Sequence, residues 1–538
     1  MAREELKKII EKALKSLQKS GEIGNFLVPE ILIEHPKEKI RGDYATNVAF
    51  LIGKDIAKNP VEVAMILKNE IENPSFAKAT EGKEKSIIEK VETIGGFVNF
   101  FISSEYFKKQ LPVILKEKNK FGNLKIGKNE KINIEFISAN PTGPLTLGNG
   151  RGGFCGDVLV NVLEKAGYSV KREYYINDIG NQINKLGHSV IGDAEAVYKG
   201  EYINDLRKKF EGSDFKKIGE KSAKIILDKM IKPSLKKMGI GFDIWFSEKS
   251  LYENKEVDEG IEELSKKGFT YESEGSLWFK SKDLGDDKDR VLVRADGVKT
   301  YFASDIAYLK NKFKRGFNHL IVFLGADHYG YIARLKAGAH ALGYKKESVD
   351  VIVMQLVRLF EKGKEVRMSK RTGIYVTIDE LINEVGLDVA RFFFLTKGSN
   401  TQFNFDLDLA KEKSDKNPVF KVQYAYARIC SIVKKSEIKI LSSEIDFRLL
   451  KENSELNLMR KFTEFSEVIE DTTKDYQIQR MPQYATELAD AFHSFYENCQ
   501  VITKDKELSQ ARLSLVLATK IVLKNTLDLM GISSPEKM

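Results

Sequence analysis

One strand–helix–strand segment constrains this chain more than any other feature. Residues 131–137, "KINIEFI", have the apolar and β-branched composition of a buried strand, and residues 169–176, "SVKREYYI", predict a second strand. Between them, "GRGGFCGDVLVNVLEKAG" predicts a helix that ends at Gly167. Two strands joined through a helix run parallel, with a right-handed crossover. The segment therefore predicts a doubly wound parallel sheet, an α/β fold.

The rest of the chain divides around this α/β core. Residues 1–120 mix helical and alternating strand patterns, which predicts an N-terminal α+β domain. Residues 121–407 form the predicted Rossmann-like domain, interrupted by a lysine-rich helical insertion at about 183–250, with strands resuming near residue 291. Residues 408–538 have helical periodicity only and predict an all-α bundle. Three domains agree with a length of 538 residues.

Composition excludes several classes of protein. The first residues, "MAREELKKIIEKALKSL", predict an amphipathic helix without the apolar core of a signal peptide, and no apolar run reaches membrane-spanning length. The three cysteines, Cys155, Cys430 and Cys499, are far apart and form no zinc or disulfide pattern. A net charge of +9 suits a polyanionic partner without requiring one. A cytoplasmic protein without membrane contact is expected.

The turn after the first predicted strand is rich in glycine and hydroxyl residues. In a doubly wound sheet, ligands bind at the carboxyl ends of the strands, near where the strand order reverses. The strand ends at Ile137–Ser138, and a helix beginning near Gly148 points its free N–H groups and its positive dipole end at the same place. Phosphate binding is one interpretation. The other is that the glycines of this helix serve only helix–strand packing.

A second candidate element is "EVRMSKRTG", residues 365–373. It places Arg367, Lys370 and Arg371 around Met368 and Ser369 and ends in a glycine. Cations on such a loop can meet a triphosphate and its leaving pyrophosphate. Taken alone, such a loop is more often a solvated basic surface.

Taken together, the two elements resemble a class I aminoacyl-tRNA synthetase. Further segments, in order along nearly the full chain, are similar to those of the arginyl-tRNA synthetase family. They include "RGDYATNVAF", "GGFVNFFIS", "EFISANPTGPL", "YYINDIGNQI", "FDIWFSE", "RVLVRADGVKTYFASDIAYLKNKF", "GADHYGYIARLKA", "VRMSKRTG", "TIDELINEVGLDVARFFFL", "NPVFKVQYAYARICSI" and "GISSPEKM".

The resemblance implies roles for individual residues. The family's phosphate signature, His-x-Gly-His, is here Thr146-Leu147-Gly148-Asn149, so both histidines are replaced. The implied catalytic set is Thr146, Gly148, Asn149, Arg367, Ser369 and Lys370. The implied ATP-binding set is Pro144, Gly148, Asn149, Gly325, Asp327, His328, Val357, Leu359, Met368 and Lys370.

The resemblance also implies an arginine site and a tRNA-binding helix. The arginine site comprises Glu135, Ser138, Asn140, Tyr301 and Asp305, and a guanidinium needs carboxylates that can accept its forked donors. Gln423, Tyr424 and Arg428 of the helical tail are expected to contact tRNA, because aromatic and basic neighbours suit unpaired bases. The implied substrates are L-arginine, ATP with Mg²⁺, and tRNA(Arg), used by a monomer. The N-terminal domain is expected to grip the tRNA elbow.

Other interpretations remain open at this point. The replaced histidines fit a synthetase-like RNA-binding protein that has lost catalysis. A class I enzyme for another amino acid is disfavoured, because an apolar substrate gains nothing from the buried carboxylate of Asp305. A nucleotidyltransferase would need neither the helical tail nor the N-terminal domain. For the two tyrosines of "VQYAYAR", burial in the core is the alternative to RNA contact, and Asp178 of "YYINDIGNQI" could cap a helix.

Overall fold

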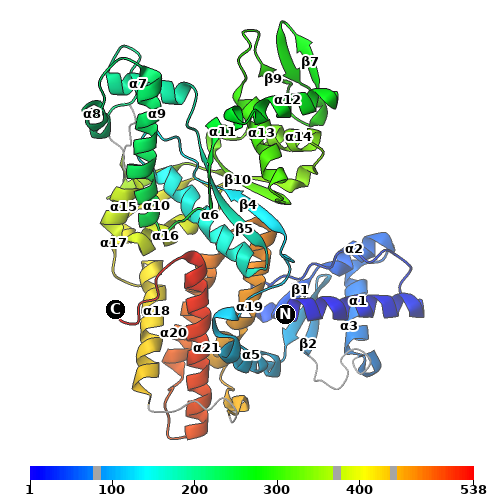
Figure 1. The fold of residues 1–538 in the computed structure, drawn as a ribbon. Helices are drawn as coiled ribbons and strands as arrows, with labels where there is room; N and C mark the ends of the chain where they lie inside the picture. Colours follow the sequence, from blue (N-terminus) through cyan, green and yellow to red (C-terminus); the bar gives the residue numbers. More distant parts are fainter. Residues whose placement is uncertain (77–86, 367–376, 437–444) are drawn as a thin grey trace.

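The computed structural model describes residues 1–76, 87–366, 377–436 and 445–538. Figure 1 shows three parts: a small α/β unit at the N-terminus, a larger α/β unit around β4, β5 and β10, and a helical bundle that carries the C-terminus. The predicted succession of α+β, α/β and all-α segments is therefore found along the chain.

The N-terminal unit is a three-stranded antiparallel sheet, in the order β1-β3-β2, packed against helices. Its elements are α1 (Ala2–Ser20), β1 (Tyr44–Thr46), α2 (Val48–Asp55), α3 (Pro60–Glu72), β2 (Ile88–Ile94) and β3 (Phe97–Ile102). The next helix, α5 (Ser104–Glu117), packs against α19 (Asn453–Asp475) and α21 (Lys506–Met530) of the bundle. The chain thus enters the bundle before it enters the parallel sheet.

The central sheet has the order β11-β10-β4-β5-β6, and every neighbouring pair is parallel. Its strands are β4 (Lys131–Glu135), β5 (Ser169–Ile176), β6 (Ile244–Ser247), β10 (His319–Gly325) and β11 (Val349–Met354). Helices α6 (Leu147–Lys165), α13 (Tyr301–Lys314) and α14 (Tyr331–Ala341) connect or cover them. Strand order reverses between β4 and β10, so the predicted ligand position lies there.

The predicted helical insertion is present between β5 and β6. It comprises α7 (Asn181–Ile191), α8 (Glu201–Arg207), α9 (Phe215–Ile226) and α10 (Lys232–Lys237), and its glycines let α7 and α9 pack backbone to backbone. Strand β6 lies inside the range expected for the insertion. After it come α11 (Glu248–Glu253), α12 (Glu256–Lys266) and a separate antiparallel sheet of β7 (Thr270–Ser273), β8 (Ser276–Phe279) and β9 (Arg290–Val293). The strand expected near residue 291 is confirmed, but it belongs to that separate sheet.

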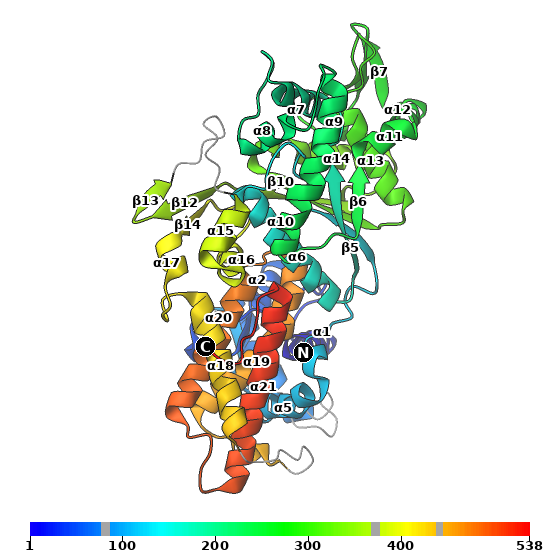
Figure 2. The ribbon, with the colours of Figure 1, turned by 60° about the vertical axis from the view of Figure 1, so that its left-hand side comes forward.

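The remaining elements connect the sheet to the bundle (Figure 2). A small sheet, β13-β12-β14, contains β12 (Val357–Glu361), β13 (Lys364–Val366) and β14 (Phe403–Asp406), flanked by α15 (Ile378–Val385), α16 (Leu387–Leu395) and α17 (Leu407–Lys411). The bundle consists of α18 (Pro418–Lys435), α19, α20 (Arg480–Asn498) and α21, which confirms the all-helical end. Among the described residues, no helix is long and apolar enough to cross a membrane.

Helix α6 lies between the sheet and the bundle, and fourteen of its nineteen residues are buried. A Cβ on Gly150 would lie 2.5 Å from Ile378 Cδ1, and one on Gly153 would lie 2.8 Å from Ile137 Cδ1. These two glycines therefore serve close packing, as the second interpretation of the turn proposed. Gly148 is different: it is exposed, and only the hydroxyl oxygen of Thr146, at 3.7 Å, lies near its Cβ position.

Candidate active site

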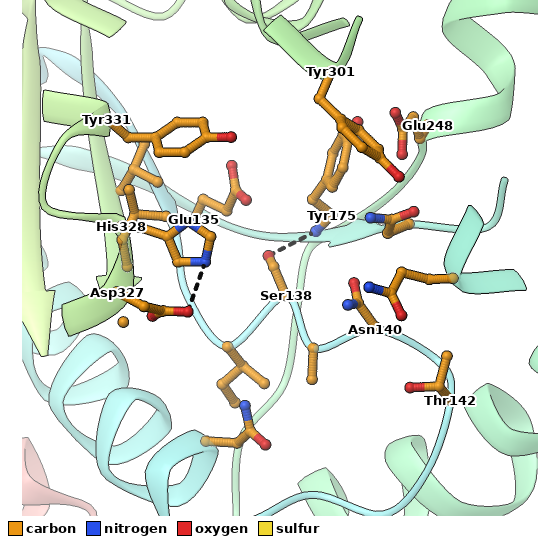
Figure 3. Close-up of a pocket in the computed structure, with 18 of the residues that line it drawn as sticks. Glu135, Ser138, Asn140, Thr142, Tyr175, Glu248, Tyr301, Asp327, His328 and Tyr331 are labelled. Atoms are coloured by element: carbon orange, nitrogen blue, oxygen red, sulfur yellow. Dashed lines mark hydrogen bonds and ion pairs between the residues drawn. The ribbon is translucent and has the colours of Figure 1, made fainter. Parts of the chain in front are cut away.

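A cavity of about 690 Å³ opens at the carboxyl ends of the strands that flank the strand-order reversal. Figure 3 shows side chains from β4, β5, α13 and the β10–α14 connection converging on it. Its lining includes Glu135, Ser138, Asn140, Pro144, Thr146, Asn149, Tyr175, Glu248, Tyr301, Asp305, Lys312, Gly325, Asp327, His328 and Tyr331. All five residues expected to bind arginine are among these.

The end of β4 has unusual backbone geometry. Ile137 has φ 68° and Ser138 has φ 37°, the left-handed region that β-branched residues in particular avoid. The bend turns Ser138 toward the neighbouring strand, where its Oγ accepts a hydrogen bond of 3.0 Å from the backbone N–H of Tyr175 (Figure 3). Backbone strain of this kind collects at functional sites, because the surrounding structure has to hold it in place.

One face of α13 forms a wall of the cavity. Tyr301, Asp305, Tyr308 and Lys312 recur at helical spacing and all line it. Lys312 Nζ lies 2.6 Å from Glu135 Oε2, and both side chains are almost completely buried. Glu135 therefore already has a cation of the protein as its partner.

Two other carboxyl groups in the cavity are not neutralised by an ion pair with any described residue. Oδ2 of Asp305 is buried and has no hydrogen-bond partner there. Burial, together with the nearby Glu248 and Glu135, raises the pKa of Asp305 to about 7. Burial also raises the pKa of Glu248 to about 7, although Ser304 and Tyr175 hydrogen-bond to this carboxyl group. Two such carboxyls can accept a cation.

Thr146 and Asn149 form a capping box at the start of α6. Asn149 Oδ1 accepts from the backbone N–H of Thr146 at 3.0 Å and from its hydroxyl at 2.9 Å. The hydroxyl oxygen in turn accepts from the backbone N–H of Asn149 at 3.4 Å. Both residues are thus helix-start residues and also line the cavity. The amide nitrogen of Asn149 takes no part in the box and keeps two donor hydrogens.

The residues expected to bind ATP fall into three groups. Pro144, Asn149, Gly325, Asp327 and His328 line the cavity. Gly148, Val357 and Leu359 are not part of that lining; Val357 and Leu359 are buried in β12. Met368 and Lys370 lie outside the described residues, as do Arg367 and Ser369 of the catalytic set.

The three residues expected to contact tRNA occupy different environments on α18. Gln423 is 9% exposed, and its amide donates to Asp388 Oδ2 at 2.8 Å and to the backbone carbonyl of Ser533 at 3.0 Å, which holds the C-terminal segment against α16. Tyr424 is half-buried, with the Arg428 guanidinium 5.0 Å above its ring. Tyr426 is buried, so the core interpretation is right for that tyrosine.

Sequence reasoning missed Glu248 as a site residue. It lies within "FDIWFSE", and its role depends on β6 pairing with β5, which places it beside Tyr175 and Asn177. Asp178, which the sequence suggested as a possible helix cap, accepts two hydrogen bonds. One comes from the Ser247 hydroxyl at 2.5 Å and the other from the backbone N–H of Lys249 at 3.0 Å. Asp178 therefore stabilises the start of α11, the helix that carries Glu248.

Comparisons with known proteins agree with this architecture. Three family descriptions match: "Arginyl tRNA synthetase N terminal domain" over residues 4–102, "tRNA synthetases class I (R), catalytic domain" over 110–211 and 193–406, and "DALR anticodon binding domain" over 422–538. The arginine–tRNA ligase of Caldanaerobacter subterraneus is 44% identical over 100% of this chain and 99% of its own, and that of Acetivibrio thermocellus is 42% identical with the same coverage.

Solved structures give the same result. A putative arginyl-tRNA synthetase from Campylobacter jejuni is 32% identical with a TM-score of 0.75, over 81% of this chain and 100% of that one. Arginyl-tRNA synthetase from Thermus thermophilus, 20% identical over the whole of both chains, has a TM-score of 0.78 and shares the fold.

The parallel sheet, the cavity at its strand-order reversal and the helical C-terminal domain define a class I aminoacyl-tRNA synthetase. Among the families of that class, the chain belongs to the arginyl-tRNA synthetases. It is an enzyme, and its reaction is arginine–tRNA ligation. None of these similarities favours the inactive RNA-binding alternative.

The cavity generates a prediction about pH. Burial raises the pKa of Asp305 and of Glu248 to about 7, so a guanidinium that binds to these carboxyls in place of their protons is expected to release protons near neutral pH. The affinity for L-arginine should therefore fall as pH drops from 8 to 6, by up to about tenfold per pH unit for each group. Titration calorimetry in buffers of different ionisation enthalpy should detect net proton release at pH 7.

Asp305→Asn supplies the control for this experiment. It should weaken arginine binding and reduce the number of protons released. Equal arginine affinity at pH 6 and pH 8 in the parent protein would contradict the assignment of these two carboxyls.

Proposed function

We propose that the cavity binds L-arginine and ATP side by side and joins them as arginyl-adenylate. The observation that carries this assignment is the pair of buried carboxyls, Asp305 and Glu248, which form no ion pair with any described residue. The arginine guanidinium is permanently charged and presents forked donors that match carboxylates. In this proposal Glu135, paired with Lys312, supports that wall rather than taking the guanidinium itself.

The other end of arginine is assigned to Ser138 and Asn140, near the bend after β4. Tyr301, at the start of α13, is 51% exposed, and we assign it to the cavity mouth above the guanidinium. This arrangement places the arginine carboxylate toward the start of α6. No side chain has to act as a nucleophile, because the substrate carboxylate attacks the α-phosphate and pyrophosphate leaves.

The ATP phosphates are assigned to the start of α6 and the adenosine to the side of Gly325, Asp327 and His328. The helix N-terminus and the amide of Asn149 supply donors to the phosphate oxygens. By resemblance, Arg367, Ser369 and Lys370 supply the cationic part. Val357 and Leu359 are assigned to adenine through their backbone.

Magnesium enters this proposal as part of the substrate, MgATP. Mg²⁺ keeps several waters and binds mainly phosphate oxygens in such sites. The described residues contain no cluster of three histidine, cysteine, aspartate or glutamate side chains that could hold a resident metal ion.

The tRNA is assigned to the helical bundle and the N-terminal domain. We assign Tyr424 and Arg428 to contact with anticodon bases, and Gln423 to holding the C-terminal segment that lies beside them. The terminal ribose hydroxyl of tRNA would attack the adenylate in the cavity. We further propose domain boundaries at about 1–120, 121–407 and 408–538, a monomer as the active form, and action in the cytoplasm.

Arginine activation is expected to need bound tRNA, as the resemblance implies. ATP–pyrophosphate exchange driven by arginine should be weak without RNA and strong after addition of tRNA(Arg). A tRNA for another amino acid is the matched control. Strong exchange with no RNA would contradict the tRNA requirement while leaving the ligase function intact.

Asn149→Ala should lower the rate of arginine activation by about 10²–10³, because it removes a donor aimed at developing phosphate charge. Asn149→Asp keeps an acceptor for the capping box but removes the donors, so it should be at least as inactive. Asn59→Ala is the matched control: Asn59 also caps a helix, α3, through a bond to Val61 N–H, but far from the cavity. Full activity of Asn149→Ala in exchange assays would leave Asn149 with the capping role alone.

Tyr424→Ala and Arg428→Ala should each weaken tRNA binding while the affinity for ATP stays unchanged. Loss of one base-stacking contact is worth roughly 1–3 kcal/mol. Tyr424→Phe keeps the ring and should retain most of the affinity, measured by filter binding or fluorescence titration. If both truncations bound tRNA like the parent with their folds intact, the two side chains would be structural.

A further inference from the structure

Arg151 is one of the largest fully buried side chains of the protein, with 0% exposure. It lies in the first turns of α6, two residues after Asn149. Its Nη1 donates to the carbonyl of Gln355 at 2.8 Å, and its Nη2 donates to the carbonyls of Gly398 at 2.8 Å and Thr401 at 2.9 Å. The guanidinium forms no salt bridge with any carboxylate in the described part of the chain.

Burying a cation without an anionic partner is costly, and burial lowers the pKa of Arg151. Arg391 provides a comparison near the same helix: it is 1% exposed, and it pairs with Asp157 of α6 as well as with the carbonyls of Met238 and Met530. An apolar side chain at position 151 would fill the same space at lower cost. What Arg151 adds is direction: two nitrogens of its rigid guanidinium donate to three carbonyl groups.

Those carbonyls belong to two segments that meet beside the nucleotide side of the sheet. Gln355 lies between the end of β11 at Met354 and the start of β12 at Val357. Its backbone N–H donates to the carbonyl of Ser399 at 2.9 Å, and the N–H of Phe403 donates to the carbonyl of Leu356 at 3.1 Å. Arg151 binds carbonyl groups of both segments, the β11–β12 connection and the segment that precedes β14. It therefore sets the position of the start of β12 relative to the start of α6.

We propose that Arg151 is a positioning residue for ATP. It fixes the spacing between the start of α6, where the phosphates are assigned, and the backbone from Val357 to Leu359, where the adenine is assigned. The inference rests on the proposed nucleotide site. A nucleotide that spans both points requires this spacing, whereas arginine, assigned to Asp305 and Glu248 on the other side of the cavity, does not.

The test uses Arg151→Met and Arg151→Lys in ATP–pyrophosphate exchange with tRNA present. Arg151→Met should raise the KM for ATP about tenfold or more, because small displacements of binding groups are costly, while the KM for arginine changes less than about threefold. Lysine, a point charge with a different reach, should fall between methionine and the parent. If the Met variant fails to fold, the KM values of the Lys variant for ATP and arginine provide the test.

Fragments of the nucleotide make the test sharper. Adenosine engages the β12 end with Gly325 and Asp327, and pyrophosphate engages the α6 end, so neither fragment spans the distance that Arg151 is proposed to fix. In Arg151→Lys the inhibition constants of both fragments should therefore stay within about twofold of the parent values while the KM for ATP rises. Arg391→Met is the matched control for a lost buried guanidinium. It should lower thermal stability without changing the KM for ATP selectively.

Two results would overturn the proposal. One is an unchanged KM for ATP in folded Arg151 variants; the other is an equal rise in the KM values for ATP and arginine, which would make Arg151 a general structural residue. If the parent protein itself showed no exchange, the proposed function would fail instead, so the two failures are distinguishable.

Discussion

The packing of helix α6 is the constraint on which the other parts depend. The helix contacts strands of the parallel sheet on one side and α16, α19 and α21 on the other, so all but its ends is buried. Gly150 and Gly153 remove side chains where Ile378 and Ile137 come closest. Asn161 donates to the carbonyl of Leu529 at 2.9 Å and ties the far end of α6 to α21. The end of the cavity at the start of α6 is therefore fixed relative to the bundle as well as to the sheet.

The same arrangement shows why sequence reasoning succeeded in some places and failed in others. The βαβ unit, the insertion and the helical tail were predictable because their patterns are long and periodic. Strand β6 was missed because it has four residues, too few for a periodic signal inside a helical stretch. Strand β9 was predicted as a strand but placed in the wrong sheet, because its own sequence does not show that it pairs with β8.

The same contrast between local patterns and distant partners applies to the residues of the site. Asp305 was named through the resemblance, and the structure places it on one face of α13 with Tyr301, where both line the cavity. Glu248 and Arg151 were not predicted, because their roles come from distant segments: Glu248 faces the cavity through β6 pairing with β5, and Arg151 contacts carbonyls more than two hundred positions away. Tertiary partners of that kind leave no local signal.

Helix α19 connects the three parts through polar contacts that are mostly buried. Glu467, with a side chain 1% exposed, receives the Tyr44 hydroxyl at 3.0 Å and lies 2.9 Å from His35 of the N-terminal domain. Just past the end of α19, the Tyr476 hydroxyl donates to Asp350 of β11 at 2.9 Å. Charged groups held out of water fix orientation, because losing one partner leaves the other unpaired. Polar contacts of α19 and of Tyr476 just beyond it therefore link the N-terminal domain to a strand of the sheet that holds the cavity.

The replacement of both signature histidines changes the number of hydrogen-bond donors more than the net charge. A histidine with an ordinary pKa is mostly neutral at pH 7, so Thr146 and Asn149 remove little net charge there. What changes is the number of hydrogen-bond donors. The Thr146 hydroxyl donates to Asn149 Oδ1, which leaves the Asn149 amide as the side-chain donor of this pair for the cavity.

The exposed Gly148 and the N-terminal end of α6 add backbone donors and a positive dipole at the same point. Arg151, two residues further along the helix, ties this end of α6 to three backbone carbonyl groups of other segments. Phosphate affinity can therefore be retained without imidazole, provided that α6 stays fixed in place.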